Sequence, residues 1–389
     1  MKLAVITTVY RPDSHTDVIM ARWFEDLPSD SAWGWHGPKT EIASAYVAQR
    51  PANDLSATRF AEQGVPVFST IAEALRVGGS ELAVDGVLLI AEHGEYPYNK
   101  LGQRLYPRSE MFHAVCNVFE ADGRSVPVFF DKHLSWDFER GREMLERAGR
   151  LGFGVLSASS LPFCRYDPPV DCDGQAVEEV LAVFPLVDGG KPESYGYHAL
   201  EVVQHVLERR RGGAAGVESV MAWRGAEVWD AAESRRWSAE LLGQVWTRAM
   251  PGRPLPSAAI EAELEEPSHA FVIRYADGLE LAMVGVTGTM EFSFGFRVGD
   301  QLQGAVIRAG LGEADRYPNF AILSRVAEDW LIGGPAPYPD ERVLLTCGTL
   351  QAMAQSAALP AGTPLETPHL TGLGYTPAPQ RSGVAYLAD

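Results

Sequence analysis

The stretch AVITTVYRPDSHTDVI, residues 4–19, decides the fold of the first half of this chain. It places an apolar strand-like run before a polar loop and the start of a helical pattern. The same order repeats along the first 160 residues. Strand-like runs lie at 2–7, 41–48, 84–91, 126–130 and 154–159, and helical patterns at 15–27, 54–63, 70–78, 108–121 and 136–150. This alternation predicts a doubly wound α/β domain over residues 1–160, built on a parallel sheet.

The pattern changes after residue 160. A helical pattern at 196–210 precedes strand-like segments at 216–229, 269–276, 279–286 and 290–298, and helical patterns at 318–332 and 340–357 follow. Period-two alternation in MEFSFGFRV (290–298) and the turn pair Asp277-Gly278 favour antiparallel strands. We expect residues 161–389 to form an α+β domain with an open, largely antiparallel sheet.

The composition limits the partners of the protein. Asp and Glu outnumber Lys and Arg by 51 to 33, so a phosphate backbone or an anionic membrane surface would be repelled. The four cysteines form no C-x-x-C pair, which indicates reduced thiols. With no signal-like start and no apolar run of about 18 residues, we expect a cytoplasmic protein that binds a small molecule and neither nucleic acid nor membrane.

The loop between Thr7 and His15 contains no glycine. In the G-x-G-x-x-G loop of dinucleotide-binding folds, the glycines let the pyrophosphate approach the backbone amides at a helix N-terminus. Here the corresponding span has bulky side chains, a proline without an N–H donor, and the carboxylate of Asp13. This composition argues against ordinary dinucleotide binding.

Four segments resemble the glucose-fructose oxidoreductase, inositol dehydrogenase and MocA family (Gfo/Idh/MocA). They are DLSATRFAEQGVPVFSTIAEAL (54–75), VPVFFDKHLSWDFERGREMLERAGRLGFGVLSASS (126–160), ESYGYHALE (193–201) and AEDWLIGGPAPYPDERVLLTCGTL (327–350). The resemblance implies a Rossmann-like first domain and an NAD- or NADP-dependent oxidoreductase acting on a sugar, polyol or related hydroxy compound. It also implies a homo-oligomer formed through the open face of the second sheet.

The resemblance also implies the catalytic residues. Asp131 and Lys132 stand in the place of the family's Glu-Lys-Pro motif. Lys132 and His198 would flank the carbon that loses hydride, with His198 as the acid/base. The family's aspartate is Ser194 here, with Glu193 beside it, so the expected set is Lys132, His198, Asp131 and Glu193. Independently, a lysine between a buried strand and a helix can polarise an oxygen, and desolvation can shift it toward neutrality.

The cofactor would lie against three loops in this family. After the second strand the family offers an acidic residue to the ribose; this chain has Gln49 and Arg50, and the arginine suits the extra phosphate of NADP. Glu92 and His93 replace the nicotinamide-side Pro-x-x-x-His stretch. The resulting cofactor-binding residues are Thr8, Tyr10, Arg11, His15, Gln49, Arg50, Glu92 and His93.

Residues 92–108, EHGEYPYNKLGQRLYPR, form a long loop after a buried strand, at the edge where open α/β sheets bind ligands. The planar rings and hydrogen-bond donors of this loop suit a carbohydrate or a carboxylated substrate. The tyrosines could instead pack the loop against the second domain. The candidate substrate residues are Tyr96, Tyr98, Asn99, Arg104 and Arg108.

A divalent metal is the alternative cofactor. The layout brings Glu92, His93, His133 and His198 toward one cleft, and imidazoles with a carboxylate suit a metal ion; because their spacing is dispersed, a hydrogen-bonded polar cleft is the favoured explanation. A non-redox lyase, isomerase or hydrolase on the same fold, with or without a metal, is therefore the alternative function. The gathering of ionisable groups argues against a third possibility, a non-catalytic binding protein.

Overall fold

The first sheet of the protein is parallel and has six strands. The computed structural model describes residues 1–187, 191–261, 266–310 and 316–378. The strands follow the order β3-β2-β1-β4-β5-β6, which confirms the predicted doubly wound fold. They are β1 (Lys2–Val9), β2 (Glu41–Gln49), β3 (Val67–Phe68), β4 (Gly86–Ile90), β5 (Val128–Asp131) and β6 (Val155–Ala158).

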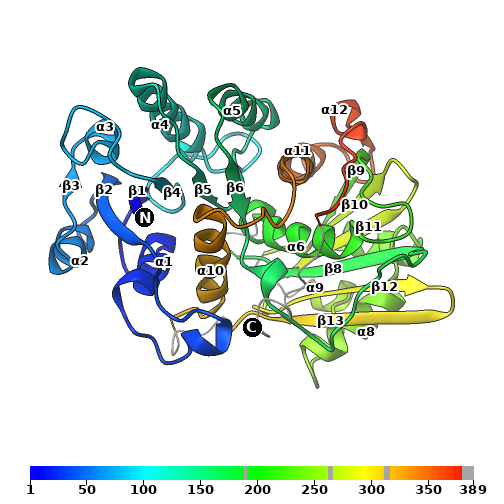
Figure 1. The fold of residues 1–389 in the computed structure, drawn as a ribbon. Coiled ribbons are helices and arrows are strands. Elements are labelled where there is room, and N and C mark those ends of the chain that lie inside the picture. Colours follow the sequence, from blue (N-terminus) through cyan, green and yellow to red (C-terminus); the bar gives the residue numbers. More distant parts are fainter. Residues whose placement is uncertain (188–190, 262–265, 311–315, 379–389) are drawn as a thin grey trace.

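Helices cover both faces of this sheet, with α3, α4 and α5 along one face and α1 along the other (Figure 1). Side-chain caps fix several of their starts: Ser14 caps α1, Asp137 caps α5, and Thr70 and Glu73 form the predicted capping box of α3. These caps satisfy backbone N–H groups that have no partner inside the helix. The helices are α1 (His15–Phe24), α2 (Ser56–Glu62), α3 (Ile71–Leu75), α4 (Arg108–Asp122) and α5 (Phe138–Leu151).

The second sheet has eight strands in the order β14-β9-β10-β11-β8-β12-β13-β7. Its β11–β8 pair is parallel and its other pairs are antiparallel, as expected for a largely antiparallel sheet. Gly278, with φ of 89°, makes the predicted turn between β10 and β11. The strands are β7 (Arg165–Asp167), β8 (Glu179–Pro185), β9 (Val217–Arg224), β10 (His269–Tyr275), β11 (Glu280–Val286), β12 (Phe292–Val298), β13 (Gln301–Arg308) and β14 (Leu365–Glu366).

One predicted strand, 216–229, is too long. The strand ends at Arg224, and Gly225, with φ of 60°, turns the chain into α7 (Ala226–Glu233). The apolar pattern continues past the turn because Val228 and Trp229 on the helix are also buried. The remaining helices are α6 (Pro192–Leu207), α8 (Ala239–Ala249), α9 (Ala258–Glu261), α10 (Asn319–Leu331), α11 (Asp340–Ser356) and α12 (Pro368–Thr371).

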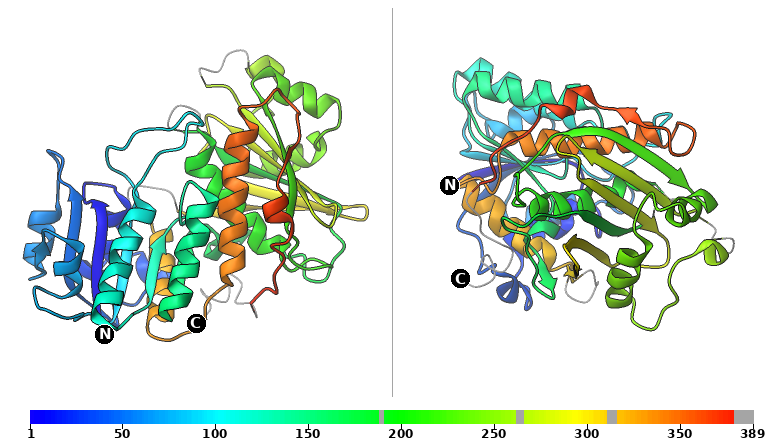
Figure 2. Two further views of the ribbon diagram at one scale, coloured as in Figure 1. Left: turned by 90° about the horizontal axis from the view of Figure 1, so that it is seen from above. Right: turned by 90° about the vertical axis from the view of Figure 1, so that its right-hand side faces the viewer.

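Each face of the second sheet packs on helices of the same chain. On the inner face, α6 packs on β8 and β11, and α11 runs between the sheet and α5 (Figure 2). On the outer face, α7 and α8 bury a separate cluster that includes Trp229, Trp237 and Trp246. The face that the sequence analysis assigned to subunit contacts is thus largely covered within the chain.

Helix α10, from the second half of the chain, packs on the first sheet. This helix contacts α1, β5 and β6, and so closes the face of the first sheet that α1 covers (Figure 1). Buried Arg22 donates to the backbone carbonyls of Arg316 and Tyr317, and the Arg316 guanidinium pairs with Asp17 at 2.9 Å. The second half of the chain therefore fixes the start of α1.

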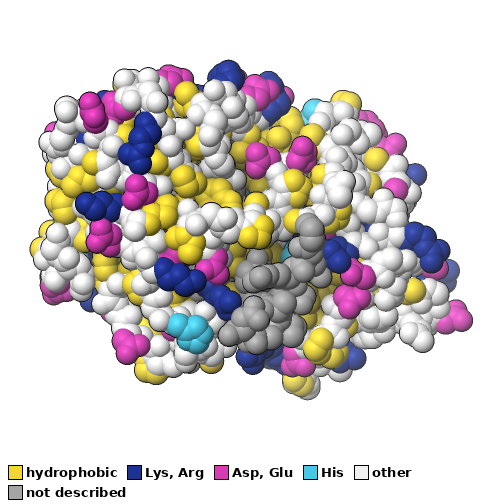
Figure 3. Space-filling view, in the orientation of Figure 1, with side chains coloured by type: hydrophobic (Ala, Val, Ile, Leu, Met, Phe, Trp, Pro, Cys, Tyr) yellow, Lys and Arg dark blue, Asp and Glu magenta, His cyan; other side chains and the backbone are white. Residues whose placement is uncertain are grey.

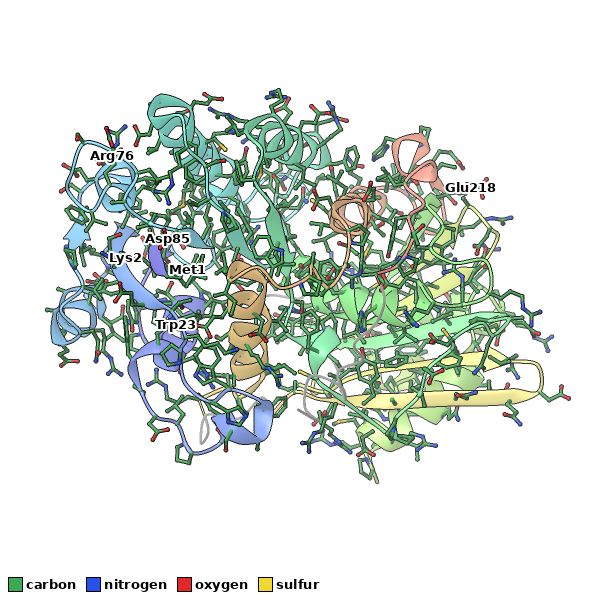
Figure 4. The ribbon with its side chains drawn as sticks, viewed as in Figure 1. Met1, Lys2, Trp23, Arg76, Asp85 and Glu218 are labelled. Carbon is green, nitrogen blue, oxygen red and sulfur yellow. The ribbon has the colours of Figure 1, made fainter. Side chains whose placement is uncertain are left out.

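On the face drawn in Figure 3, acidic and basic side chains are interspersed. Lys2 and Asp85 lie together at the amino end of β1 (Figure 4), where the Lys2 amide donates to the Asp85 carboxylate. Among the described residues, no helix is both long and apolar enough to cross a membrane.

Candidate functional site

A cavity of about 540 Å³ lies between the carboxyl edge of the first sheet and the second domain. It is bounded by the loops after β1, β4, β5 and β6, by the start of α6, and by the start of α10. The cavity gathers most of the ionisable groups that the sequence analysis singled out. Its polar lining comprises Arg11, Asp13, His15, Glu92, His93, Arg104, Arg108, Lys132, His133, Ser160, Lys191, Glu193, Ser194, His198 and Asn319, together with the tyrosines Tyr98, Tyr106, Tyr195 and Tyr317.

Glu92 holds two cations at the floor of this cavity. Its Oε1 atom lies 3.0 Å from the Lys132 ammonium, and its Oε2 atom accepts a hydrogen bond from Arg108. All three side chains are buried. Arg108 also lies 2.9 Å from the His133 ring. A buried carboxylate with two partners stays charged and fixes both cations in place.

Lys132 is an ammonium, contrary to the expectation that desolvation would neutralise it. Burial opposes the charged form, but the charges of Glu92 and Asp131 and the hydrogen bond to Glu92 together outweigh it, so the pKa of Lys132 is raised. Burial likewise opposes the Glu92 carboxylate, yet the charges of Lys132 and Arg108 hold its pKa well below the usual value. Lys132 can therefore stabilise negative charge on a substrate oxygen but cannot act as a base.

His15 and Asp131 form a dyad across the sheet. The His15 Nδ1 atom lies 2.6 Å from Asp131 Oδ2, and Asp131 is 1% exposed. A carboxylate only accepts hydrogen bonds, so Nδ1 carries the proton and a neutral His15 has its lone pair on Nε2. The ring lines the cavity and is held edge-on between His93 and Phe320. This is the arrangement of an oriented general base.

His198 is the second histidine suited to proton transfer. Its Nδ1 atom lies 2.7 Å from the Ser159 hydroxyl, and the ring lines the cavity from α6. Burial, followed by the charge of Lys132, holds the pKa of His198 well below the usual value. The imidazole is therefore neutral at pH 7, and its tautomer depends on the direction of the Ser159 hydrogen bond.

The proposed metal ligands come together without forming a metal site. Within the described residues, no group of three or more His, Cys, Asp or Glu side chains is placed to hold a metal ion. Glu92 is committed to Lys132 and Arg108, and His93 Nδ1 accepts from the His15 amide. Burial, followed by the charge of His15, lowers the pKa of His93 to about 3. Burial, with Arg108, lowers the pKa of His133 to about 4. The metal expectation gains no support from this geometry.

Three residues at this edge have left-handed backbone. Asp13, His93 and Lys132 have φ of 59°, 67° and 65°. This region is costly for side chains other than glycine and occurs mostly where the surroundings enforce it. At Lys132 the Ser157 hydroxyl donates to the carbonyl, and the amide donates to Ala158. The strained residues lie on the loops that carry the polar lining.

The N-terminus of α1 is closed by the protein itself. The amide of Asp13 donates to Asp17 at 3.1 Å, that of Ser14 to the Arg11 carbonyl, and that of His15 to His93. Ser14 accepts from the Asp17 amide. These are the donors that a pyrophosphate uses at a helix N-terminus, and two carboxylates adjoin them. The residues present do not fit a dinucleotide pyrophosphate.

Several predicted residues lie away from the cavity. Tyr10 is 1% exposed and packs against Phe60 in the core. Thr8 is buried, and its hydroxyl donates to the Glu92 carbonyl. Gln49 bonds the backbone of Glu95, and Arg50 is exposed at the end of β2. Tyr96 packs edge-on against Tyr106, and Asn99 bonds within its own loop. Their predicted ligand contacts remain untested.

The structure adds residues that the sequence reasoning passed over. Ser159 supports His198, and Asn319 donates to the Ser160 hydroxyl at 2.8 Å. Both serines follow β6, so the rule that ligands bind at strand carboxyl ends would have found them. Asn319 and Phe320 begin α10, and their approach depends on tertiary packing alone.

The chain matches known proteins in structure and not in sequence. No family model matches the sequence, and no curated protein matches it. Solved structures match nearly its whole length. GenD2 from gentamicin A biosynthesis, in complex with NAD, has a TM-score of 0.59 at 14% identity and covers 94% of this chain and 96% of its own.

Two inositol dehydrogenases have similar likeness. The scyllo-inositol dehydrogenase of Lactobacillus casei has a TM-score of 0.56 at 11% identity, covering 92% of this chain and 95% of its own. The myo-inositol dehydrogenase of Corynebacterium glutamicum has a TM-score of 0.56 at 12% identity, and the match covers 94% of this chain and 99% of its own. At such identities the likeness establishes architecture and leaves activity open. The chain therefore has the two-domain fold of the inositol dehydrogenases and of GenD2.

Proposed function

We propose that this protein is a divergent enzyme of the Gfo/Idh/MocA type that has replaced nicotinamide chemistry with acid–base chemistry. Its substrate is a hydroxy carbonyl compound related to a sugar or polyol, and its reaction is an isomerisation or an elimination. The observation that carries the proposal is the His15–Asp131 dyad, which stands at the start of α1 beside the Lys132 ammonium.

The roles follow from the charges of the groups. His15 Nε2 removes a proton from the carbon next to the substrate carbonyl; the electron pair of that C–H bond forms a C=C bond, and the π pair of the carbonyl moves onto its oxygen. Asp131 holds the His15 tautomer and stabilises the imidazolium that forms. Lys132 stabilises the negative charge on the oxygen. Neutral His198 accepts the proton of the neighbouring hydroxyl and, as the imidazolium, returns it to the former carbonyl oxygen in an isomerisation; in an elimination the His15 imidazolium protonates the leaving group.

The closed start of α1 supports this assignment. A bound pyrophosphate would have to break the hydrogen bonds of the Asp13, Ser14 and His15 amides and approach the carboxylates of Asp13 and Asp17. Unpaired buried donors and repelled charges each cost free energy. A reaction that needs no dinucleotide avoids both costs.

Solvent hydrogen exchange tests the proposal. The protein is incubated in D₂O, without added cofactor, with a panel of ketoses, keto-polyols and hydroxy keto acids, and proton NMR follows each C–H signal. We expect deuterium to enter one substrate at the carbon beside its carbonyl. Exchange should be lost in His15→Gln and retained in His36→Gln, a matched change at a histidine outside the cavity lining. No exchange in any compound, or equal exchange in His15→Gln, would contradict the proposal.

A second candidate is NAD(P)-dependent oxidation of a sugar or polyol. The likeness to GenD2 in complex with NAD favours it, as does the placement of Lys132 and His198 in the same cavity. In this case a hydroxy compound would reduce added NAD⁺ or NADP⁺, and the reduced nicotinamide would absorb in the near ultraviolet. Dinucleotide-dependent turnover, with no exchange in its absence, would favour this candidate over the first.

A further inference from the structure

A second cavity of about 280 Å³ adjoins the first. The two share Gly102, Lys191 and Glu193 in their linings. The second cavity lies between the tip of the 92–108 loop, the start of α6, the ends of β9 and β10, and the last turns of α11. The two cavities therefore meet at these three residues.

Cations surround the side cavity. Lys100, Lys191 and Arg224 line it, with Glu193 as the acidic residue of the lining. Within the described residues neither Lys100 nor Arg224 forms an ion pair, whereas Glu193 accepts from the Arg104 amide at 2.9 Å and lies 3.7 Å from His133. In a chain of net charge −18, two cations at one cavity, Lys100 and Arg224, with no carboxylate partner among the described residues, favour an anionic ligand.

His269 provides the second, independent observation. It is 6% exposed and lines the side cavity, and neither ring nitrogen has a hydrogen-bond partner among the described residues. His269 and Arg224 are directly opposite each other in the β9–β10 pair, so their side chains share one face of the sheet. A buried imidazole with no partner is a costly arrangement, and a ligand oxygen in this cavity would satisfy it.

The opposite wall of the side cavity is apolar. Leu350, Met353, Ala354, Ala357 and Ala358 of α11 and its end form it. Small side chains on this wall leave room for a ligand group. The cavity thus combines cationic and hydrogen-bonding groups with an apolar wall.

We propose that the side cavity binds an oxyanion group of the substrate, a carboxylate or a phosphate, through Arg224, Lys100 and the His269 ring. The inference rests on the proposed function and deepens it: the substrate is an acidic hydroxy carbonyl compound whose reacting carbon lies by His15 and Lys132. The anion places the substrate along the line between the two cavities. Lys191, at their junction, is within the lining of both.

Anion binding to the intact protein tests this site without any turnover. Sodium acetate and inorganic phosphate are titrated separately by calorimetry and by NMR of the histidine rings, with the His269 signal assigned from its absence in His269→Gln. We expect one of the two anions to bind with Kd near 1 mM or tighter and to shift the His269 signal. The anion that binds identifies the group as carboxylate or phosphate.

Variants separate the two cavities. The double variant Lys100→Gln, Arg224→Gln should weaken binding by about tenfold or more, because each charge-assisted contact is lost. The matched change Arg211→Gln, at an exposed arginine outside the lining, and Lys132→Met in the main cavity should leave binding within about twofold, a change of less than 0.5 kcal/mol. Binding that survives the double variant but fails in Lys132→Met would place the anion in the main cavity and overturn the proposal.

Absence of saturable binding by both anions would also overturn it. Failure of the proposed acid–base reaction is distinguishable from this result, because anion binding is measured without substrate conversion. Anion binding that is weakened in the double variant, together with no hydrogen exchange in D₂O, would support the anion site in the side cavity and contradict the proposed acid–base reaction.

Discussion

The Nδ1 atom of His15 lies 2.6 Å from Oδ2 of Asp131, although 116 positions separate the two residues in the chain. The contact spans the carboxyl edge of the first sheet, from the start of α1 to the end of β5. It places an oriented imidazole where a dinucleotide-binding protein of this fold keeps its phosphate loop.

Removing the carboxylate of the dyad should impair catalysis while the fold persists. Asp131→Asn keeps the size of the side chain but no longer favours the His15 tautomer with its lone pair on Nε2. We expect the rate of hydrogen exchange into substrate to fall by about 10²–10⁴-fold. The circular dichroism spectrum and the unfolding midpoint serve as controls. An exchange rate within about twofold of the unchanged protein would remove the dyad from the mechanism.

Lys132 should contribute through its charge alone. Lys132→Met keeps the length of the side chain and leaves Glu92 paired with Arg108. We expect kcat to fall by about 10²–10³-fold, the loss seen when one stabilising donor is removed from a developing oxyanion. Lys100→Met, a matched change at a lysine outside the main cavity lining, should retain kcat and raise KM. Equal loss of kcat in both variants would contradict the assigned role.

The buried ion pairs between α6 and α11 should contribute more to the free energy of unfolding than an exposed ion pair does. Arg342 is fully buried and lies 2.8 Å from Glu201 and 3.2 Å from Glu208. Arg342→Met leaves two buried carboxylates without their cation, so we expect the free energy of unfolding in urea to fall by about 3–5 kcal/mol. The matched surface change Arg308→Gln, which breaks the exposed pair with Asp167, should cost about 1 kcal/mol or less. Similar costs for both variants would refute this ranking.

Acidification should destabilise the fold through buried histidines. His205 is 4% exposed, and burial, followed by the charge of Arg342, lowers its pKa to about 3. Between the ordinary value near 6.5 and about 3, the unfolded chain binds a proton that the folded chain does not, so stability falls as the pH falls. This group alone contributes about 1.4 kcal/mol per pH unit in that window.

Urea titrations at pH 7, 6 and 5 measure this slope. His205→Gln should make the loss of stability smaller by about 1.4 kcal/mol per pH unit, which is the slope that one bound proton produces. The exposed His36→Gln should leave the slope unchanged. If His205→Gln retains the slope of the unchanged protein, other groups account for the acid sensitivity.

The architecture was predictable from the sequence because its signals are local. The uninterrupted apolar run ending in Ile90 predicted a strand buried on both faces, and β4 is fully buried. Thr70 and Glu73 predicted a helix start that the structure confirms. Strand β8 was not predicted. Glu179–Pro185 pairs with strands that follow it by about a hundred positions, and no turn signal adjoins it in the sequence.

The sequence indicated several of the residues that line the cavity, but not the chemical role that each can take. The rule that parallel strands end at one edge brought Glu92, His93 and His133 together. The charge of Lys132 could not be read from the sequence, because it depends on a carboxylate 40 positions away. Likewise, the role of His15 depends on its contact with Asp131. The sequence does not indicate His269, because the lack of a partner for its ring nitrogens among the described residues results from tertiary packing.

The most direct test of the account is a calorimetric titration of the purified protein with NAD⁺, NADH, NADP⁺ and NADPH. Because the amides at the start of α1 are already bonded and Asp13 and Asp17 adjoin them, we predict no binding in the micromolar range by any of the four. Micromolar binding of one nucleotide, weakened by a change at Arg11 or His15, would contradict the account and return the site to nicotinamide chemistry.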